Sequence, residues 1–488
     1  MKVLFAASEA FSLVKTGGLG DVIYALPRAL KAKGVDVRLV LPAYREVLQK
    51  LDSFNISGWQ QIPGSNRELC VRLLDAGDSL LGLPLLLIDV PGLIDRPGGG
   101  PYQQHNGFDW PDNAERFTVF SRAVAEFARG NLGEADWRPD VVHSHDWQTG
   151  LVSAFLSRDL KPPRTVFTIH NLAYGGHFGH DDFVKLYLPG EWWAADGVEF
   201  YHNFSMLKAG IVFSDAVTTV SPTYAKEILT PEYGCGYQGL LTTYADKLSG
   251  ILNGIDMEVW NPAADKFIKQ NYSLTDSFVK GKQINKKALL AEFGLKTTEK
   301  MLNAPLLGFV GRLVEQKGID LITAAIPKII EETDANFVIV GSGQDKYQTE
   351  LTNLQQKYPE RMGLFVGYSE VKGHLLEAGS DIFLMPSRFE PCGLNQLYSL
   401  AYGTPPIVNH TGGLADTVID ANAKTLSNNN ATGFVFHNAN VNEFIARIKD
   451  ALALYAKPKP WQQLVKNCMS QDFSWEHSAE SYLKIYQS

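Results

Sequence analysis

The sequence predicts an α/β protein with two doubly wound, mostly parallel sheets, one in each half of the chain. Short apolar segments typical of buried parallel strands alternate with amphipathic helical segments. Several of these strands end in glycine or small polar residues, and the alternation restarts after a polar stretch at residues 265–287. The length of 488 residues is sufficient for two or more domains. Ligands of such sheets bind beyond the carboxyl ends of the strands.

The first half opens with a strand, a Gly-rich turn and a helix. Its expected strands are residues 1–7, 35–41, 83–90, 141–143, 165–169 and 217–220, and its expected helices are residues 22–33 and 112–130. Val22, Leu26 and Leu30 share one face of the first helix at helical spacing. We therefore expect a Rossmann-like N-terminal domain over residues 1–256.

The second half repeats the same alternation. Its expected strands are residues 305–310, 337–340, 364–366, 382–385 and 406–408, each followed by a helical pattern. We expect a second Rossmann-like domain over residues 257–473. Residues 474–488 end the chain with an amphipathic helical pattern.

Composition excludes several classes of partner. The chain is 45% hydrophobic and 20% charged, its net charge is −8, and it has no long basic block, so nucleic acid is not an expected partner. No stretch of about 18 apolar residues predicts a membrane span. The four cysteines are far apart and form no CxxC motif, which fits a reduced, cytoplasmic setting. The sequence leaves the oligomeric state open.

The Gly-rich turn after the first strand is a candidate ligand site. Its run is Lys15-Thr16-Gly17-Gly18-Leu19-Gly20-Asp21. Glycines let backbone approach a ligand closely, the helix that follows offers free N–H groups, and Lys15 adds a cation. We therefore take Lys15, Gly18 and Asp21 as candidate substrate-binding residues. The alternative is a plain strand-to-helix turn with an exposed lysine.

Two cations follow the first strand of the second half. They are Arg312 in Gly311-Arg312-Leu313 and Lys317 in Gln316-Lys317-Gly318, both expected just past the strand end. A loop entering a helix can bring two such cations together, and two cations suit a diphosphate. The alternative is a pair of surface charges.

A third candidate site is Arg388-Phe389-Glu390-Pro391-Cys392-Gly393-Leu394, which opens the expected helix at residues 394–402. Glu390 can accept hydrogen bonds from sugar hydroxyls, and the backbone N–H groups of Cys392 and Gly393 can bind a sugar or an anion. Glu390 can equally be a carboxylate that only stabilises the helix start. No motif ties a histidine to Cys392, which argues against a nucleophilic cysteine. Thr411 and Gly412 begin a second Gly-rich helix start and a further phosphate candidate.

Histidines and an aspartate follow two strands of the first half. His143, His145 and Asp146 invite a metal site, but no ligand spacing demands one, so we expect structural histidines and a sugar-contacting Asp146. His170 follows the strand at residues 165–169, where it can face a ligand or be a satisfied core histidine. No metal is expected.

The ordered motifs resemble those of bacterial glycogen synthases and plant starch synthases over nearly the whole chain. Besides the runs above, the resemblance rests on Ser8-Glu9-Ala10, Asp112-Asn113-Ala114-Glu115-Arg116-Phe117, His145-Asp146-Trp147, Thr168-Ile169-His170-Asn171 and Leu252-Asn253-Gly254-Ile255-Asp256. It implies the GT-B fold, with two domains facing a cleft and a C-terminal helix that crosses back to the first domain. It also implies a retaining α-1,4-glucosyltransferase of glycosyltransferase family five.

The resemblance implies ADP-glucose as donor and glycogen or a maltooligosaccharide as acceptor. The roles carried over place Lys15 near the diphosphate, Arg312 and Lys317 on it, and Glu390 with the backbone of Cys392 and Gly393 on the glucose. His170 is expected near the anomeric carbon. Asp146 and Asn253 are expected to line the cleft.

Two positions depart from the wider pattern. Many relatives in the superfamily have a second Glu eight residues after the first, where this chain has Tyr398, which weakens any two-carboxylate scheme. Asn409-His410 precedes Thr411 where basic residues are expected, and the role of His410 stays open.

Three alternative functions remain. Another hexosyltransferase of the same fold could use UDP-glucose, because nothing in the residues themselves fixes the base. A dinucleotide oxidoreductase is disfavoured, because Gly17-Gly18-Leu19-Gly20 lacks the GxGxxG spacing. A catalytically silent glucan-binding protein is disfavoured because every candidate cationic and acidic site position is filled.

Overall fold

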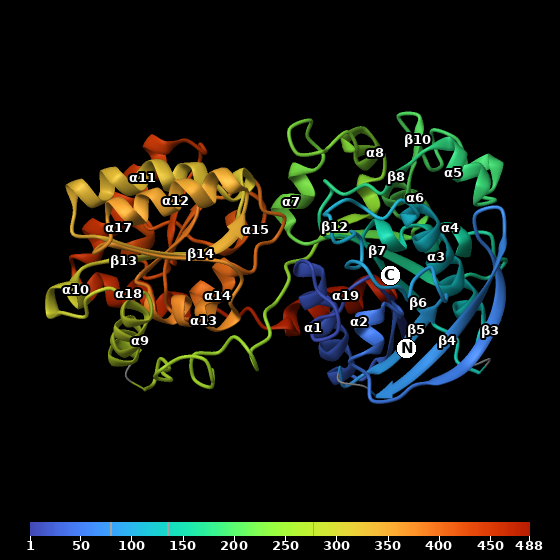
Figure 1. Ribbon diagram of the computed structural model, residues 1–488, viewed down its shortest axis with the longest axis horizontal. Helices are drawn as coiled ribbons and strands as arrows, with labels where there is room; N and C mark the ends of the chain where they lie inside the picture. Colours follow the sequence, from blue (N-terminus) through green and yellow to red (C-terminus); the bar gives the residue numbers. More distant parts are fainter. Residues whose placement is uncertain (79–80, 134–135, 277) are drawn as a thin grey trace. The chain divides into compact units, whose positions relative to one another are not determined.

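The computed structural model describes residues 1–78, 81–133, 136–276 and 278–488 and divides into two compact units (Figure 1). Unit 1 is Met1–Gly254 with Trp475–Ser488, and unit 2 is Ile255–Ser474. The divisions fall at 254/255 and 474/475, where the sequence analysis placed them at 256/257 and 473/474. The backbone N–H of Ile255 donates to Phe473 O (2.8 Å), so both connecting segments enter unit 2 side by side.

Unit 1 is built, within the described residues, on a nine-stranded sheet in the order β12-β11-β7-β6-β1-β2-β5-β4-β3. Its strands are β1 (Lys2–Ala6), β2 (Asp36–Pro42), β3 (Asn55–Pro63), β4 (Glu68–Asp78), β5 (Pro84–Asp89), β6 (Val141–His145), β7 (Arg164–Ile169), β11 (Ala216–Thr219) and β12 (Leu248–Gly250). The pairs β3–β4 and β4–β5 are antiparallel, and the other neighbours are parallel.

Helices cover both faces of this sheet. They are α1 (Gly18–Ala32), α2 (Arg45–Leu48), α3 (Asn113–Arg129), α4 (Leu151–Leu156), α5 (His180–Lys185), α6 (Met206–Phe213), α7 (Pro222–Glu227), α8 (Gln238–Thr243) and α19 (Trp475–Gln487). A small sheet of β8 (His177–Phe178), β10 (Asn203–Ser205) and β9 (Glu199–Phe200) lies apart. Helix α19 packs beside α1 (Figure 1). Tyr482 and Tyr486 of α19 are buried in the core of unit 1.

Side chains alternate across the central strands, as a pleated sheet requires. On β7, Phe167 packs beneath Gly210 of α6, whereas the next residue, Thr168, bonds His143 on the side where α19 lies. The central parallel strands are buried on both faces, which explains their near-continuous apolar sequences. The polar residues inside this core are therefore exceptions that need partners.

Unit 2 contains, within the described residues, a six-stranded parallel sheet in the order β15-β14-β13-β16-β17-β18. Its strands are β13 (Leu306–Leu313), β14 (Asn336–Gly343), β15 (Met362–Val366), β16 (Ile382–Met385), β17 (Pro406–Asn409) and β18 (Phe434–Phe436). Its helices are α9 (Phe278–Glu292), α10 (Glu299–Asn303), α11 (Ile319–Glu332), α12 (Asp345–Lys357), α13 (Glu370–Gly379), α14 (Asn395–Ala401), α15 (Gly412–Thr417), α16 (Ala423–Ser427), α17 (Val441–Tyr455) and α18 (Pro458–Met469).

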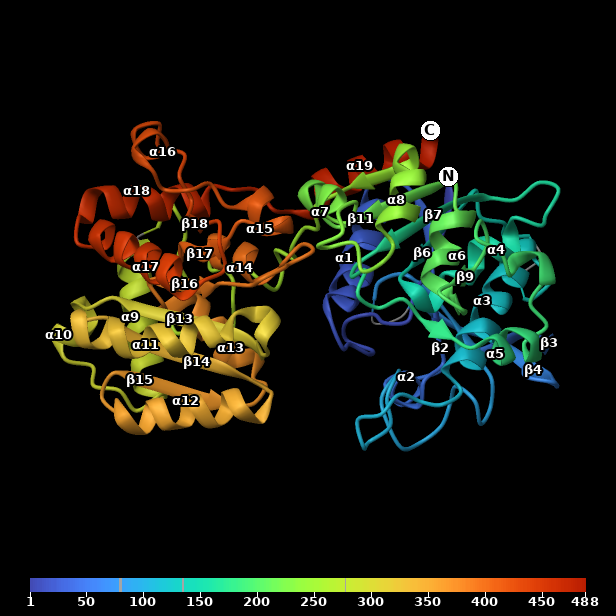
Figure 2. The same ribbon diagram turned by 90° about the horizontal axis from the view of Figure 1, so that it is seen from above.

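The helices of unit 2 flank its sheet on two sides. Helices α11 and α12 lie over one face of β13 and β14, and α13 and α14 lie over the other (Figures 1 and 2). This layering confirms the doubly wound fold expected for the second half. No helix among the described residues is both long and apolar enough to cross a membrane.

Two elements of unit 2 differ from the sequence expectation. Strand β18 was not expected. The polar stretch 265–287 is not an open connector, because its second part begins α9, which packs against α13. Polar residues hold α9 in place: Asn285 is fully buried and accepts the backbone N–H groups of Lys269 (2.9 Å) and Gln270 (3.0 Å).

Lys286 on α9 is a buried cation with a buried partner. Its Nζ lies 2.6 Å from Asp381 Oδ2 and 2.6 Å from Ala304 O, and its side chain is 4% exposed. Removing one member of a buried pair leaves an uncompensated charge, at a cost of about 3–5 kcal/mol. We predict that Lys286→Ala lowers the free energy of unfolding by about that amount.

Urea unfolding followed by circular dichroism measures this loss. The matched control is Lys287→Ala on the exposed side of the same helix, which we expect to shift stability by less than about 0.5 kcal/mol. Equal effects of the two variants would contradict the assignment of the Lys286–Asp381 pair as a buried structural contact.

Candidate active site

The candidate residues of unit 2 gather around the loop between β16 and α14. This loop contains Glu390, Cys392 and Gly393, and all three follow the carboxyl end of β16. Gly393 has φ +73°, and a Cβ there would lie 2.3 Å from Gln396 Oε1. Gln396 Nε2 in turn donates to the carbonyls of Cys392 (3.0 Å) and Gly393 (3.1 Å). A buried amide thus fixes the loop from the side of α14.

Lys317 and Glu390 form the central contact of this site. Lys317 Nζ lies 2.5 Å from Glu390 Oε2, and the two side chains are 20% and 10% exposed. Lys317 lies in the 3₁₀ turn η4 (Glu315–Lys317), and the following Gly318 has φ +71°. A Cβ on Gly318 would lie 2.2 Å from Pro386 O, so glycine lets this turn approach the end of β16. The structure therefore brings two predicted site residues into contact.

Arg312 is placed differently from the expectation. Strand β13 runs to Leu313, so Arg312 lies inside the last residues of the strand and not just past its end. Its side chain is exposed, and the described residues give its guanidinium no hydrogen bond or ion pair. Arg388, by contrast, is committed to Asp320, with two bonds of 2.8 Å and 2.7 Å. Of these two arginines, Arg312 is the one free to meet an anion.

The Thr411-Gly412 turn packs directly against the Glu390 loop. Gly413 N–H donates to Glu390 O (3.1 Å). A Cβ on Gly412 would lie 2.0 Å from Glu390 O, and one on Gly413 would lie 2.0 Å from Cys392 O. The glycines of this motif are therefore required by close backbone packing. Phosphate binding by Thr411 and Gly412 stays a prediction.

Tyr398 has a structural explanation. Trp260 is stacked between its ring and the ring of His374, with centroid distances of 3.7 Å and 3.8 Å. His374 Nδ1 lies 2.8 Å from Asp265 Oδ2, which also accepts a hydrogen bond from Tyr402 OH (2.5 Å). The position where many relatives have a second Glu is thus occupied by a stacked tyrosine ring. Tyr398 offers no second carboxylate for catalysis.

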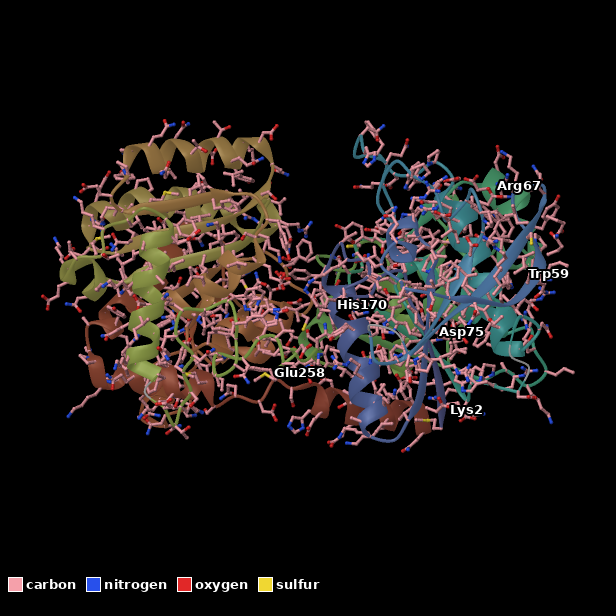
Figure 3. The ribbon with its side chains drawn as sticks, turned by 60° about the horizontal axis from the view of Figure 1, so that its bottom comes forward. Lys2, Trp59, Arg67, Asp75, His170 and Glu258 are labelled. Carbon is pink, nitrogen blue, oxygen red and sulfur yellow. The ribbon has the colours of Figure 1, made fainter. Side chains whose placement is uncertain are left out.

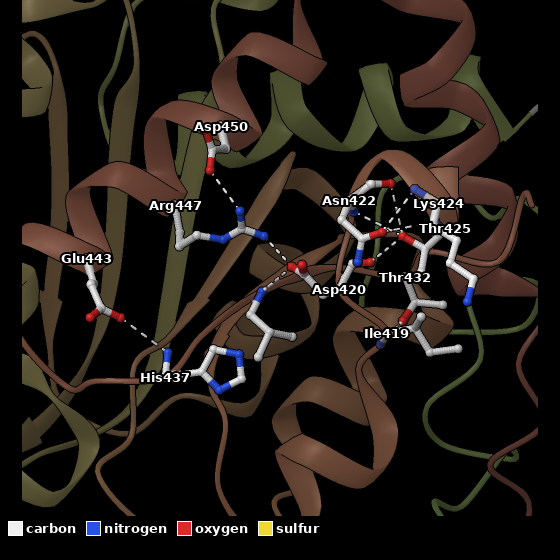
Figure 4. A network of polar contacts seen from close by, with 11 residues as sticks. Ile419, Asp420, Asn422, Lys424, Thr425, Thr432, His437, Glu443, Arg447 and Asp450 are labelled. Atoms are coloured by element: carbon white, nitrogen blue, oxygen red, sulfur yellow. Dashed lines mark hydrogen bonds and ion pairs between the residues drawn. The ribbon is translucent and has the colours of Figure 1, made fainter. Parts of the chain in front are cut away.

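His410 lies at the edge of a polar network near the ends of β17 and β18. The ring centroids of His410 and His437 are 4.8 Å apart. The backbone N–H of His410 donates to Phe436 O (2.8 Å). Figure 4 shows the neighbouring network, in which Asp420 binds Arg447 and accepts the N–H of Val435 (2.9 Å). This network holds the two strand ends together. The described residues give the His410 side chain no hydrogen bond, and its role stays open.

An exposed apolar patch at the end of β15 was missed by the sequence analysis. Val366, Tyr368 and Val371 are 43%, 85% and 50% exposed, and they lie at and just after the carboxyl end of this strand. A single exposed aromatic residue carries no signal in a sequence without knowledge of burial. Its position makes the Tyr368 ring a candidate stacking surface.

In unit 1, Glu9 organises the Gly-rich turn. Its carboxylate is 3% exposed, and it accepts hydrogen bonds from the Thr16 backbone and hydroxyl (2.6 Å to the latter) and from Gly17 N (3.3 Å). Lys15 Nζ pairs with Asp21 Oδ1 at 2.7 Å, which brings two more predicted site residues together. Glu9 lies within the Ser8-Glu9-Ala10 motif, but the sequence analysis gave it no role. The sequence signal that could have identified it is an acidic residue shortly after a buried strand.

The Asp112–Phe117 motif supports Glu9 indirectly. Arg116 Nη1 donates to Pro101 O (2.8 Å), and Asn113 Nδ2 donates to Tyr102 O (3.0 Å). These bonds fix the loop that carries Tyr102, whose hydroxyl donates to Glu9 Oε1 (2.6 Å). The motif is therefore structural support for the Gly-rich turn.

The histidines of unit 1 form a row that ends at His170. His143 and His145 are fully buried, and His145 Nδ1 lies 3.0 Å from His170 Nε2. His143 is held by Tyr486 OH (2.7 Å) and Thr168 Oγ1 (2.6 Å). Burial lowers the pKa of His143 and His145 well below the ordinary range and lowers the pKa of His170 to about 3. All three imidazoles are neutral at pH 7.

Asp146 holds the backbone of His170. Its Oδ1 accepts the His170 N–H at 2.8 Å, and its own backbone adopts φ +56°. Burial is the largest influence on its carboxyl and raises its pKa to about 7. Figure 3 shows His170 well away from the β3–β4 ribbon, along which Trp59 and Arg67 are labelled. Asp146 and His170 are thus adjacent, and their expected contacts with a sugar stay predictions.

Asn253 is 7% exposed, and its buried Oδ1 has no hydrogen-bond partner among the described residues. Its role as a lining residue stays a prediction. No group of three or more His, Cys, Asp or Glu side chains in the described part of the chain is placed to hold a metal ion.

Comparisons with known proteins show which sequences this chain is similar to. Residues 2–243 match the family model described as starch synthase catalytic domain, and residues 295–467 match glycosyl transferases group 1. The chain is 50% identical to a glycogen synthase of Hydrogenovibrio crunogenus, with 100% of both chains covered. It is 48% identical to glycogen synthase 2 of Nitrosococcus oceani, covering 100% of this chain and 97% of that one.

Two solved structures are similar to this chain over nearly its full length. The catalytic domain of starch synthase IV from Arabidopsis thaliana, bound to ADP and acarbose, matches with a TM-score of 0.87 and 34% identity. That match covers 99% of this chain and 98% of the other. A sucrose-phosphate synthase from Thermosynechococcus elongatus matches with a TM-score of 0.58 and 17% identity, which shows a shared fold alone.

Matched glycines in the two Thr-Gly-Gly-Leu motifs test the packing of the Glu390 loop. A Cβ on Gly412 would meet Glu390 O at 2.0 Å with φ +44°, whereas one on Gly17 meets nothing within 4 Å. We predict that Gly412→Ala lowers the free energy of unfolding by roughly 2 kcal/mol, from strain and overpacking. Gly17→Ala should leave thermal unfolding unchanged. Equal melting temperatures for the two variants would contradict the close packing of Gly412 against the Glu390 loop.

The raised pKa of Asp146 predicts a pH dependence of stability. The unfolded chain ionises this group near its ordinary value of 3.8, and the folded protein ionises it near 7. The stability that the neutral group contributes is therefore complete below about pH 4 and is lost as the pH rises through 7. In the Asp146→Asn variant this position does not titrate.

We expect the Asp146→Asn variant to lose less stability between pH 5 and pH 8 than the parent, by on the order of 2 kcal/mol. Urea titrations at both pH values measure the difference. A parallel loss in both proteins would show that Asp146 is ionised in the folded state at pH 5.

Proposed function

Since this chain belongs to the bacterial glycogen synthase family, we propose that it transfers glucose from ADP-glucose to the non-reducing end of a growing α-1,4-glucan. The α configuration of the transferred glucose is retained. Glycogen and maltooligosaccharides are the acceptors, and the cytoplasm is the site of synthesis. Sequence similarity to several glycogen synthases over the full length of this chain supports this activity.

The Lys317–Glu390 contact is the observation that carries the proposal. A fixed ammonium suits a diphosphate oxygen, and a carboxylate 2.5 Å away suits sugar hydroxyls. Unit 2 therefore offers adjacent groups for the two parts of a nucleotide sugar that flank the reacting bond. The exposed Arg312 guanidinium is a second cation for the diphosphate, and the Tyr368 ring is a stacking surface for the base.

The proposal also gives roles to three candidate residues of unit 1. His170 and Asp146 contact the transferred glucose, and Lys15 contributes a cation near the diphosphate. The candidate residues offer no convincing nucleophile for a covalent intermediate, since Tyr398 lies in an aromatic stack and no sequence motif ties a histidine to Cys392. We therefore favour displacement on one face through an ion-pair-like transition state, in which catalysis depends on orientation and on stabilising departing ADP.

Glucose transfer to maltooligosaccharides from ADP-glucose and UDP-glucose tests the function. We expect elongation from ADP-glucose, an α-1,4 product by proton NMR, and activity that survives EDTA because Lys317 and Arg312 supply the cationic charge. Faster transfer from UDP-glucose than from ADP-glucose would show that UDP-glucose is the donor and would contradict this part of the proposal. Binding without transfer would indicate a glucan-binding protein.

Lys317 and Arg312 test the mechanism. Departing ADP gains negative charge as the glycosidic bond breaks, so a fixed cation interacts more strongly in the transition state than with the bound donor. Removing one such electrostatic donor typically costs on the order of 10²–10³ in rate. We predict that Lys317→Ala and Arg312→Ala each lower kcat by about that factor, with smaller changes in KM.

Two further variants make this test specific. Arg312→Lys keeps the charge but not the guanidinium fork, and it should recover part of the loss. Lys328→Ala removes an exposed charge on α11 and should leave kcat unchanged. A raised KM with kcat near the parent value for Lys317→Ala would indicate uniform binding and contradict the mechanism.

A further inference from the structure

A buried row of rings extends from His170 into the core of unit 1. His143 and His145 lie two residues apart on β6 and therefore point to the same side of the sheet. The ring centroids of His143 and His145 are 4.1 Å apart, and those of His145 and His170 are 5.3 Å apart. Phe5 on the neighbouring strand β1 stacks on His145 at 5.5 Å. The His145 ring is thus held by packing on two sides and can turn little.

The contact between His145 and His170 restricts their protons. Both imidazoles are neutral, so each ring carries one proton on one of its two nitrogens. His145 Nδ1 and His170 Nε2 lie 3.0 Å apart, and a hydrogen bond between them requires a proton on one of these atoms and a lone pair on the other. Two arrangements satisfy this requirement.

The other nitrogen of His145 distinguishes the two arrangements. His145 Nε2 is buried and has no hydrogen-bond partner among the described residues. If His170 donated, His145 would carry its proton on Nε2, as a buried N–H without an acceptor. If His145 donates from Nδ1, Nε2 keeps only a lone pair. Buried N–H groups without acceptors are rarer in proteins than buried acceptors without donors. The second arrangement is therefore favoured.

We infer that His145 is a positioning residue that donates from Nδ1 to His170 Nε2 and thereby fixes His170 as the Nδ1–H tautomer. His170 is partly exposed, and the described residues give its Nδ1 no hydrogen bond, so this N–H is available to a ligand. His170 then acts as a hydrogen-bond donor to a hydroxyl or ring oxygen of the transferred sugar, and it is no base. The sugar contact depends on the proposed function, whereas the tautomer does not.

The far end of the row anchors it to α19. Tyr486 OH lies 2.7 Å from His143 Nδ1, and Arg164 Nε donates to Ile485 O (2.9 Å) in the same helix turn. These contacts hold His143 but touch neither nitrogen of His145. Tyr486→Phe is therefore a matched control, which disturbs the same buried row without removing the donor to His170.

Nitrogen-15 NMR of the unliganded protein, labelled at its 11 histidines, tests the tautomer directly. The His170 signals are assigned by their loss in His170→Gln. We expect a protonated Nδ1 and an unprotonated Nε2 for His170 in the parent protein and in Tyr486→Phe. A protonated Nε2 in the parent protein would overturn the inference. This result is independent of whether any sugar is transferred.

Variants of His145 test the consequence for catalysis. His145→Phe keeps a ring but removes the donor, and we expect His170 to populate the Nε2–H tautomer and kcat to fall roughly three- to tenfold, with KM changed less. His145→Asn places an amide N–H where Nδ1 was, and it should restore part of both readouts. Tyr486→Phe should keep kcat within about twofold of the parent value while lowering the melting temperature.

Two outcomes would contradict the positioning role. One is a His145→Phe protein in which the His170 tautomer changes but kcat does not. The other is an equal loss of kcat in Tyr486→Phe, which would indicate that the row acts only through stability. If His145→Phe fails to fold, the tautomer in the parent protein and the His145→Asn kinetics still decide.

Discussion

The candidate site of unit 2 depends on the ion pair between Lys317 and Glu390. The pair joins a turn after β13 to the loop after β16, two segments 73 residues apart in the sequence. Gly318 allows the turn to reach that loop, Gln396 fixes the loop carbonyls, and Gly412 and Gly413 allow the next motif to pack against it. Without the pair, a largely buried carboxylate and an ammonium would each lack a partner. Under the proposed function, the same ammonium and carboxylate are suited to a diphosphate and a sugar, so a contact that holds two loops together is also the proposed donor site.

Unit 1 uses a different physical principle. Besides the Lys15–Asp21 pair, its candidate residues lie at a buried row of histidines, where burial keeps the three imidazoles uncharged and raises the pKa of the neighbouring Asp146 to about 7. The Gly-rich turn is stabilised by a carboxylate, Glu9, which accepts the N–H groups that a plain turn would leave to water.

Much of this organisation could be predicted from the sequence, because it follows local patterns. Buried parallel strands have continuous apolar runs, and the site residues follow them at the carboxyl ends. The place of Glu9 was missed because it is buried partly by Tyr102, which is distant in sequence, and Tyr368 was missed because the exposure of a ring cannot be read from the sequence. The start of α9 was not predicted within the polar stretch 265–287, because Asn285 and Lys286 are polar residues buried by specific partners. Strand β18 was not predicted because it is only three residues long. Arg312 was misplaced because β13 continues to Leu313, beyond the end of its apolar run.

The central claim is that Lys317 binds the diphosphate while Glu390 binds the sugar. Calorimetric titration with ADP, which lacks the glucose, separates the two roles most directly. The account predicts that Lys317→Ala weakens ADP binding by about 10- to 100-fold, as expected for a lost charged hydrogen bond. It predicts that Glu390→Gln leaves ADP affinity within a few-fold of the parent value while abolishing most transfer. Equal losses of ADP affinity in both variants would contradict the account.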